Sequence, residues 1–110
     1  MTERIDPQKH LRRMWENSPK LAKAKAERVY LEEFRKSKKA LLMKESEGQS
    51  AAIQERNAYS HPEYLALLDG LKTAVEAEEL LKWRMVTDQA SVETWRSQEA
   101  SNRAIDRSAA

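Results

Sequence analysis

Apolar residues recur at intervals of three and four along most of the chain, the spacing that places them on one face of an α-helix. Ser18 and Pro19 supply a capping oxygen followed by a residue whose fixed φ suits the first helical turn. They predict a long helix from Pro19 to about Glu45. Ahead of it we expect an N-terminal arm over residues 1–17, with a short helix from Pro7.

Turn-forming residues divide the rest of the chain. Gly48, in the stretch SEGQS, predicts the end of the long helix because glycine readily adopts the left-handed conformation found there. A shorter helix is expected over residues 51–58. Ser60 and Glu63 have the spacing of a capping box, so the last helix is predicted to begin there and to run to about Arg103.

The predicted last helix carries two apolar surfaces. One is a heptad seam from Tyr64 to Val92, suited to packing against another helix. The other lies apart from the seam and has four members: Leu65, Leu80, Trp83 and Ala90. A two-helix hairpin cannot cover both surfaces. We therefore expect self-association through Trp83, the alternative being that the helix over 51–58 or the segment 11–15 folds over it.

These elements predict an all-α protein. The expected fold is a long antiparallel helical hairpin over residues 18–107, coiled-coil-like and oligomeric, with short additional helices and a disordered tail over residues 108–110. The 110 residues of the sequence are 35% charged and include two Gly and three Pro, a composition typical of long helices. The sequence has no cysteine, which excludes disulfides and thiolate metal sites. The longest apolar run is YLALL, far shorter than a membrane span, so we expect a cytoplasmic protein.

Charge is sorted along the sequence despite a net charge of only +2. Residues 1–40 hold twelve Lys or Arg against six acids, whereas residues 41–110 hold eight against twelve. On the long helix, an apolar arc that includes Tyr30, Phe34 and Leu42 is expected to face a partner helix. Beside this arc lies a basic stripe, to which we add Lys38 because it falls inside the arc and reaches outward along its aliphatic stem. The stripe has six members: Lys25, Arg28, Arg35, Lys36, Lys38 and Lys39.

The basic stripe has two interpretations, and the sequence leaves both open. It is either a track for the phosphates of an external polyanion or a solvated face partly neutralised by Glu32 and by acids of the last helix. Aromatic side chains could add base stacking to phosphate contacts. Tyr30 and Phe34 are expected in the seam, which leaves Trp15, Tyr59 and Trp95 as stacking candidates. For these three we expect core or interface roles instead.

Groups that could carry catalysis are few. His10 and His61 are the only histidines in the sequence, and neither has the spacing to other ligands that metal sites require. The sequence has no glycine-rich phosphate loop and no GxSxG nucleophile motif. We therefore expect a non-enzymatic protein with no catalytic residue, metal site or cofactor, in which His61 serves as a helix cap.

Three separate segments carry a family resemblance, in this order along the chain: ERVYLEEFRKSKKALLMKE, RNAYSHPEYLALLDGL and LLKWRMVTDQASVETWRSQEASNRAID. In this layout, and at positions such as Tyr30, Tyr59 and Trp83, residues 20–107 resemble small phage recombination mediators of the UvsY-like type. The resemblance implies a helical homo-oligomer that binds single-stranded DNA and helps to load a recombinase while displacing a single-strand-binding protein. It also implies that the basic stripe supplies the DNA contacts. The short stretch around Gly48 and the ending RSAA depart from the family pattern.

A function of a different class fits the same sequence. A helical protein-interaction module, such as an inhibitor of a host defence or repair enzyme or an assembly adaptor, would bind no nucleic acid. It would dock the acidic face of residues 63–79 on a basic partner. Retention on single-stranded DNA resin, together with the mass in solution, distinguishes the two classes.

Overall fold

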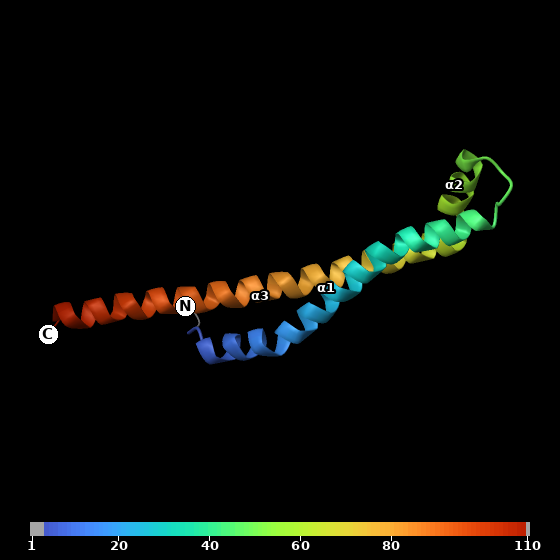
Figure 1. Cartoon of the computed structure of the whole chain (residues 1–110). Helices are drawn as coiled ribbons and strands as arrows, with labels where there is room; N and C mark the ends of the chain where they lie inside the picture. Colours follow the sequence, from blue (N-terminus) through green and yellow to red (C-terminus); the bar gives the residue numbers. More distant parts are fainter. Residues whose placement is uncertain (1–3, 110) are drawn as a thin grey trace. The chain divides into compact units, whose positions relative to one another are not determined.

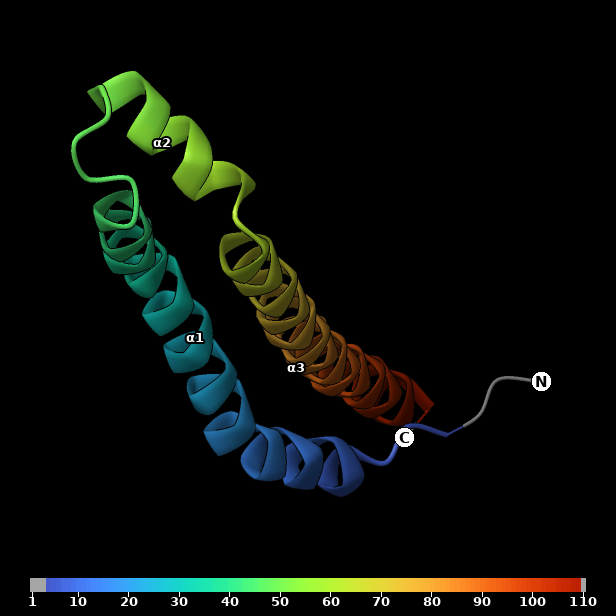
Figure 2. The same ribbon diagram turned by 90° about the vertical axis from the view of Figure 1, so that its right-hand side faces the viewer.

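The computed structural model describes residues 4–109, and within that range it contains three α-helices and no strand (Figure 1). These are α1 (Pro7–Lys44), α2 (Ala51–Ser60) and α3 (Pro62–Ala109). The chain turns back on itself through α2, which links the end of α1 to the start of α3 (Figure 2). The predicted all-α helical hairpin is therefore confirmed.

Contacts between residues group the chain into two units, each with its own packing. The terminal unit contains, among the described residues, 4–21 from α1 and 80–109 from α3. The central unit is Ala22–Glu79, which includes the rest of α1, all of α2 and the first part of α3. This division differs from the predicted arm over 1–17 and hairpin over 18–107, because both long helices contribute to both units.

The beginning of α1 is capped by an aspartate. The Asp6 Oδ1 atom accepts hydrogen bonds from the backbone N–H groups of Gln8 at 3.0 Å and Lys9 at 3.5 Å. An aspartate at this position also places negative charge near the positive end of the helix dipole. The predicted short helix from Pro7 is thus present as the first part of α1, whereas residues 1–3 of the predicted arm lie outside the described part of the chain.

The helix start predicted at Pro19 is wrong, because α1 continues through this residue. The Ser18 Oγ atom donates a hydrogen bond to the Met14 carbonyl at 2.7 Å, so it serves the preceding turn and does not cap a new helix. Pro19 has no N–H group to offer the Trp15 carbonyl four residues earlier. Serine and proline are signals for a helix start, but a long helix with favourable packing on both sides can accommodate them in its interior.

The break between α1 and α2 follows the prediction. Gly48 has φ 94°, the left-handed conformation that side chains disfavour. The Ser50 hydroxyl then accepts a hydrogen bond from the Ile53 N–H at 3.3 Å and caps α2. The helix expected over residues 51–58 extends to Ser60.

The junction between α2 and α3 uses His61 in place of the predicted capping box. His61 has extended backbone angles, and its Nδ1 accepts a hydrogen bond from the Glu63 N–H at 3.1 Å. The Ser60 hydroxyl instead donates to the Arg56 carbonyl at 2.9 Å, within its own helix. The capping box is wrong in its residues, while His61 as a helix cap is confirmed. Pro62 suits the first position of α3 because no helical bond is required of its nitrogen.

The far end of α3 lies beyond its predicted position. The helix passes Arg103 and continues to Ala109, so residues 108 and 109 of the predicted disordered tail are helical. Ala110 lies outside the described residues. The segment after Arg103 has neither glycine nor proline, so it contains no signal that would end the helix.

The core of the central unit is small. Leu42, Ala58 and Tyr64 are buried, and Met43 and Leu68 pack against them. The three buried residues come from α1, α2 and α3 in turn, so this cluster holds the hairpin closed at its turn. None of the helices in residues 4–109 combines the length and the low polarity that crossing a membrane requires.

The packed face of α1 in the central unit differs from the predicted apolar arc. Phe34 and Leu42 are packed as expected, but Tyr30 is 62% exposed and Leu41 is also exposed. The packed face includes four half-buried cations in place of these residues: Arg28, Arg35, Lys38 and Lys39. Their aliphatic stems cover apolar surface while the charged ends remain within reach of acids and water. The assignment of Tyr30 to the seam is therefore wrong.

Candidate functional site

Within the basic stripe, Arg28 is engaged by acids of its own chain. Its guanidinium donates hydrogen bonds to Glu78 of α3 and, at 3.0 Å, to Glu32 one helical turn away. These two carboxylates raise the pKa of Arg28 above its ordinary value, and the hydrogen bond to Glu78 makes the larger contribution. The arginine therefore serves to pair α1 with α3 inside the central unit.

Two lysines of the stripe are also paired across the central unit. Lys38 Nζ lies 2.9 Å from a carboxylate oxygen of Glu63, and Lys39 Nζ lies 2.9 Å from one of Glu55. The hydrogen bonds from these lysines lower the pKa of both glutamates. Lys39 also lies over the Tyr59 ring, 4.6 Å from its centroid. The pairing of Lys38 agrees with the interpretation of the stripe as a face neutralised by acids of the last helix, whereas Lys39 is paired with an acid of α2, which that interpretation did not include.

The other three cations of the stripe form weak ion pairs or none with acids of the described chain. Lys36 contacts Glu33 at 3.4 Å, and both side chains are exposed, so the pair contributes little to the stability of the fold. Lys25 is exposed and Arg35 is half-buried, and neither has an ion-pair partner among residues 4–109. Arg35, Lys36 and Lys39 line a hollow with Tyr59 and Tyr64. The six cations thus do not form one outward track.

Folding redistributes the charge that is sorted along the sequence. The central unit holds ten Lys or Arg against eleven acids, a net charge of −1. The described residues of the terminal unit hold ten Lys or Arg against six acids, a net charge of +4. The positive excess of the folded chain therefore lies in the terminal unit and not around the basic stripe.

The terminal unit also presents the largest exposed aromatic side chains. Trp15 is 82% exposed and has Leu11, likewise exposed, one turn before it. Arg12 lies three residues before Trp15, the spacing of neighbours on a helix surface. Trp15 therefore does not lie in a core of its own chain, and its expected interface role stays a prediction, whereas Trp95 is half-buried.

The predicted self-association surface is exposed at all four positions. Leu80, Trp83 and Ala90 belong to the terminal unit, where Trp83 is 62% exposed, and Leu65 belongs to the central unit. The alternative cover by residues 11–15 is not seen, because Leu11 and Trp15 are themselves exposed. The helix over Ala51–Ser60 belongs to the central unit and not to the unit that contains Trp83.

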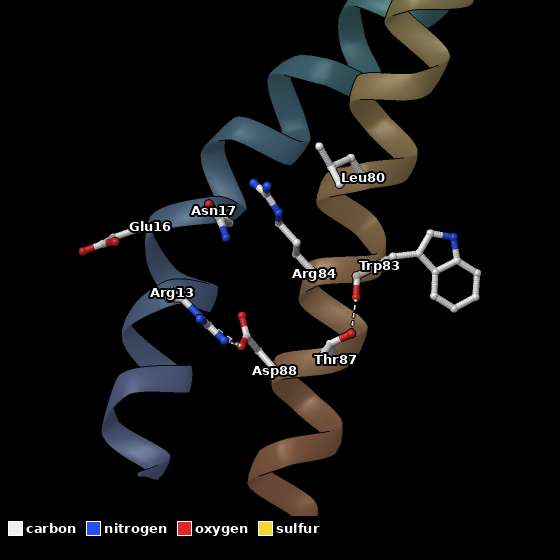
Figure 3. Close-up of a pocket in the computed structure, with 8 residues that line it drawn as sticks. All are labelled: Arg13, Glu16, Asn17, Leu80, Trp83, Arg84, Thr87 and Asp88. Atoms are coloured by element: carbon white, nitrogen blue, oxygen red, sulfur yellow. Dashed lines mark hydrogen bonds and ion pairs between the residues drawn. The ribbon is translucent and has the colours of Figure 1, made fainter. Parts of the chain in front are cut away.

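A buried carboxylate holds the terminal unit together. Asp88 of α3 is 1% exposed, and its Oδ1 atom accepts hydrogen bonds from Arg13 Nη2 at 2.5 Å and Nε at 3.2 Å (Figure 3). The His10 Nδ1 lies 2.7 Å from the same oxygen and must carry the hydrogen, since an ionised carboxylate only accepts. Burial by itself raises the pKa of Asp88, but Arg13 and His10 together outweigh burial and hold it below its ordinary value.

A hollow opens beside this cluster, between α1 and α3 of the terminal unit (Figure 3). Arg84 extends from α3 across the hollow toward α1, where Asn17 lies opposite. Glu16 points away from α3, and the Trp83 ring points away from α1. The remaining lining residues are Arg13, Leu80, Thr87 and Asp88.

The Asp88 cluster was not foreseen, although the sequence contains a signal for it. Asp88 falls at a seam position of α3, three residues after Met85 and four before Val92. An acid at a heptad core position indicates a cationic partner on the facing helix. The facing residues could not be identified because the predicted helix start at Pro19 separated His10 and Arg13 from the hairpin.

One group of residues has the composition of a metal site. Glu45, His61 and Glu63 place one potential ligand atom each within 4.8 Å of one another. The His61 Nε2 atom lies 3.2 Å from a Glu45 oxygen, and its Nδ1 accepts the backbone N–H of Glu63. A metal on Nε2 would require the proton on Nδ1 and would break this cap. Since Lys38 already neutralises Glu63, the group is best explained as an ion-pair network at the helix junction.

No protein-family model matches the sequence, and neither a curated protein nor a solved structure matches the chain significantly.

Proposed function

We propose that this protein binds single-stranded nucleic acid through the terminal unit, as a non-enzymatic accessory of the recombination-mediator type. The observation that supports this most is the exposed Trp15 in the unit that carries the positive excess of the chain. A single strand offers phosphates to the cations and unstacked bases to an exposed aromatic ring. Double-stranded DNA keeps its bases stacked and would gain nothing from Trp15.

The division of charge supports the terminal unit over the basic stripe. Arg28, Lys38 and Lys39 would have to leave their carboxylate partners in order to bind phosphate. Arg12, adjacent to the tryptophan, has no ion pair within the described chain, so it can contact a phosphate without breaking an existing bond. Three residues of the stripe, Lys25, Arg35 and Lys36, remain available for additional contacts.

The proposal is tested by fluorescence anisotropy with a labelled single-stranded oligonucleotide at several salt concentrations. Stacking of one base contributes about 1–3 kcal/mol, so Trp15→Ala should weaken binding by roughly tenfold. Arg12→Gln should reduce the logarithmic salt slope by about 0.7, the value for one phosphate contact on a single strand. Tyr30→Ala, which removes an exposed aromatic ring from the central unit, is the matched control and should bind as wild type does.

Two results would overturn the proposal. The first is wild-type protein that shows no salt-dependent binding to the oligonucleotide. The second is Trp15→Ala and Arg12→Gln variants that bind as tightly as Tyr30→Ala. If Arg35→Gln with Lys36→Gln weakens binding while the terminal variants do not, the hollow of the central unit is the site instead.

A second candidate function is a protein-interaction module without nucleic-acid binding. It is favoured by the ion pairs of Arg28, Lys38 and Lys39, which leave the central unit with little available positive charge. Light scattering of the purified protein, combined with elution from single-stranded DNA resin, separates the candidates. An assembly that is retained on the resin favours the mediator, whereas a monomer that flows through favours the module.

A further inference from the structure

The hollow of the terminal unit contains more hydrogen-bond donors than acceptors. Its one buried acceptor group is the Asp88 carboxylate, whose Oδ1 atom receives the bonds from Arg13 and His10. The other lining carboxylate, Glu16, points away from the hollow (Figure 3). The Thr87 hydroxyl donates to the Trp83 carbonyl at 2.9 Å, so its hydrogen is not available to a ligand. The negative charge of Asp88 is therefore balanced by the Arg13 guanidinium.

Two donors remain without an acceptor. Arg84 and Asn17 approach each other from opposite helices in Figure 3, and neither forms a hydrogen bond or ion pair with any residue in the range 4–109. A guanidinium has five N–H donors and no acceptor, and the amide of asparagine adds two donors and one acceptor oxygen. Two donor groups that converge on one space suit a ligand with several acceptor oxygens.

We propose that this hollow binds a phosphomonoester, either inorganic phosphate or the phosphate of a mononucleotide. The planar fork of Arg84 matches two oxygens of a phosphate, and the Asn17 amide is placed to reach a third. A carboxylate offers the Asn17 amide one oxygen fewer than a phosphate, because both of its oxygens are taken up by a bidentate arginine. Leu80 forms an apolar wall of the same hollow, against which a nucleoside attached to the phosphate can rest.

The site is distinct from the proposed strand-binding surface, because neither Arg12 nor Trp15 lines it. A concave site suits a small ligand, whereas a continuous strand is better served by an open surface. With a single uncompensated arginine, we expect a dissociation constant on the order of 1 mM, typical of weak metabolite binding.

The test is a titration of the full-length protein with inorganic phosphate, a nucleoside monophosphate and the matching nucleoside, followed by NMR. The Asn17 side-chain amide and the Arg84 Nε–H should shift and saturate with both phosphate ligands but not with the nucleoside. Arg84→Gln should weaken binding at least tenfold, and Arg84→Lys, which keeps the charge but not the fork, should weaken it by a smaller factor. Arg96→Gln is the matched control, because Arg96 pairs with Glu93 at 3.1 Å on the same helix and does not line the hollow.

Tighter binding of the monophosphate than of inorganic phosphate would support a contact of the nucleoside with Leu80. Equal affinities of Arg84→Gln, Arg96→Gln and wild type would overturn the proposal, as would shifts caused by the nucleoside alone. Unfolding curves of Arg84→Gln that match wild type establish that the variant is folded. If Arg84→Gln loses the monophosphate but retains the oligonucleotide, the two sites are independent, and failure of one proposal leaves the other standing.

Discussion

Replacing Asp88 with asparagine provides the sharpest test of how the terminal unit is held together. Asparagine keeps the shape of the side chain and removes its charge, so the bonds from Arg13 and His10 lose their ionic component. A hydrogen bond to a charged group contributes about 1.5–3 kcal/mol, and breaking a buried ion pair costs about 3–5 kcal/mol. Arg13 is 46% exposed and can regain water, so we expect a loss of about 2 kcal/mol at neutral pH.

The pH dependence of the same variant gives an independent check. The folded-state pKa of Asp88 lies below its ordinary value, so the folded protein binds fewer protons than the unfolded chain near that value. The stability from Asp88 is therefore fully present above the unfolded pKa of about 3.9 and is lost as the pH falls through the lower folded pKa. The difference between wild type and Asp88→Asn should shrink over this window.

The aromatic residues make the assay selective. All three tryptophans belong to the terminal unit and all three tyrosines to the central unit. Denaturant unfolding followed by tryptophan fluorescence thus reports on the Asp88 environment, and circular dichroism follows the helices of the whole chain. Asp106→Asn, an exposed aspartate of α3 in the same unit, is the control and should change stability by less than about 0.5 kcal/mol. Asp88→Asn with wild-type stability at neutral pH, or a deficit that does not change with acidification, would refute the role assigned to the cluster.

Three further predictions follow from the helices. Pro19→Ala should raise the free energy of unfolding by about 2 kcal/mol, because proline inside a helix costs about 3 kcal/mol and part of this cost is offset by its stiffening of the unfolded chain. A lower free energy of unfolding in urea for this variant would contradict a continuous α1. Gly48→Ala should destabilise the protein by about 1 kcal/mol because Gly48 has a positive φ, whereas Gly70→Ala, in a helix with open space around it, should stabilise the protein by about 0.5–1 kcal/mol. A higher melting temperature for Gly48→Ala than for Gly70→Ala would refute the backbone conformation assigned to Gly48. Leu80→Ser with Trp83→Ser should lower the mass measured by light scattering if this surface mediates self-association, and an unchanged assembly would exclude it.

The fold class was accessible from the sequence because it depends on local signals. Helical periodicity indicated the helices, Gly48 indicated the turn, and His61 was recognisable as a cap. Pro19 misled the prediction, since the same dipeptide starts isolated helices and is tolerated within long ones. Only tertiary packing decides between these outcomes.

The candidate site was less predictable, for a physical reason. A helical wheel counts Arg28, Lys38 and Lys39 as polar, yet their stems pack as apolar groups while their charged ends find acids on neighbouring helices. The packed face predicted from the wheel therefore included Tyr30, which is exposed in the structure. Asp88 could be recognised as an anomaly in the seam, but its partners lie more than seventy positions away in sequence, at separations of 78 and 75 residues.

The terminal unit is discontinuous in sequence: the whole of Ala22–Glu79 is inserted between its two segments. A single proteolytic cut near Gly48 would leave each fragment with a helical segment of both units, so we expect the fragments to remain associated after cleavage. For the same reason, no single truncation isolates either unit. A minimal version of the terminal unit would have to be built by excising the insert and joining Leu21 to Leu80 through a designed loop.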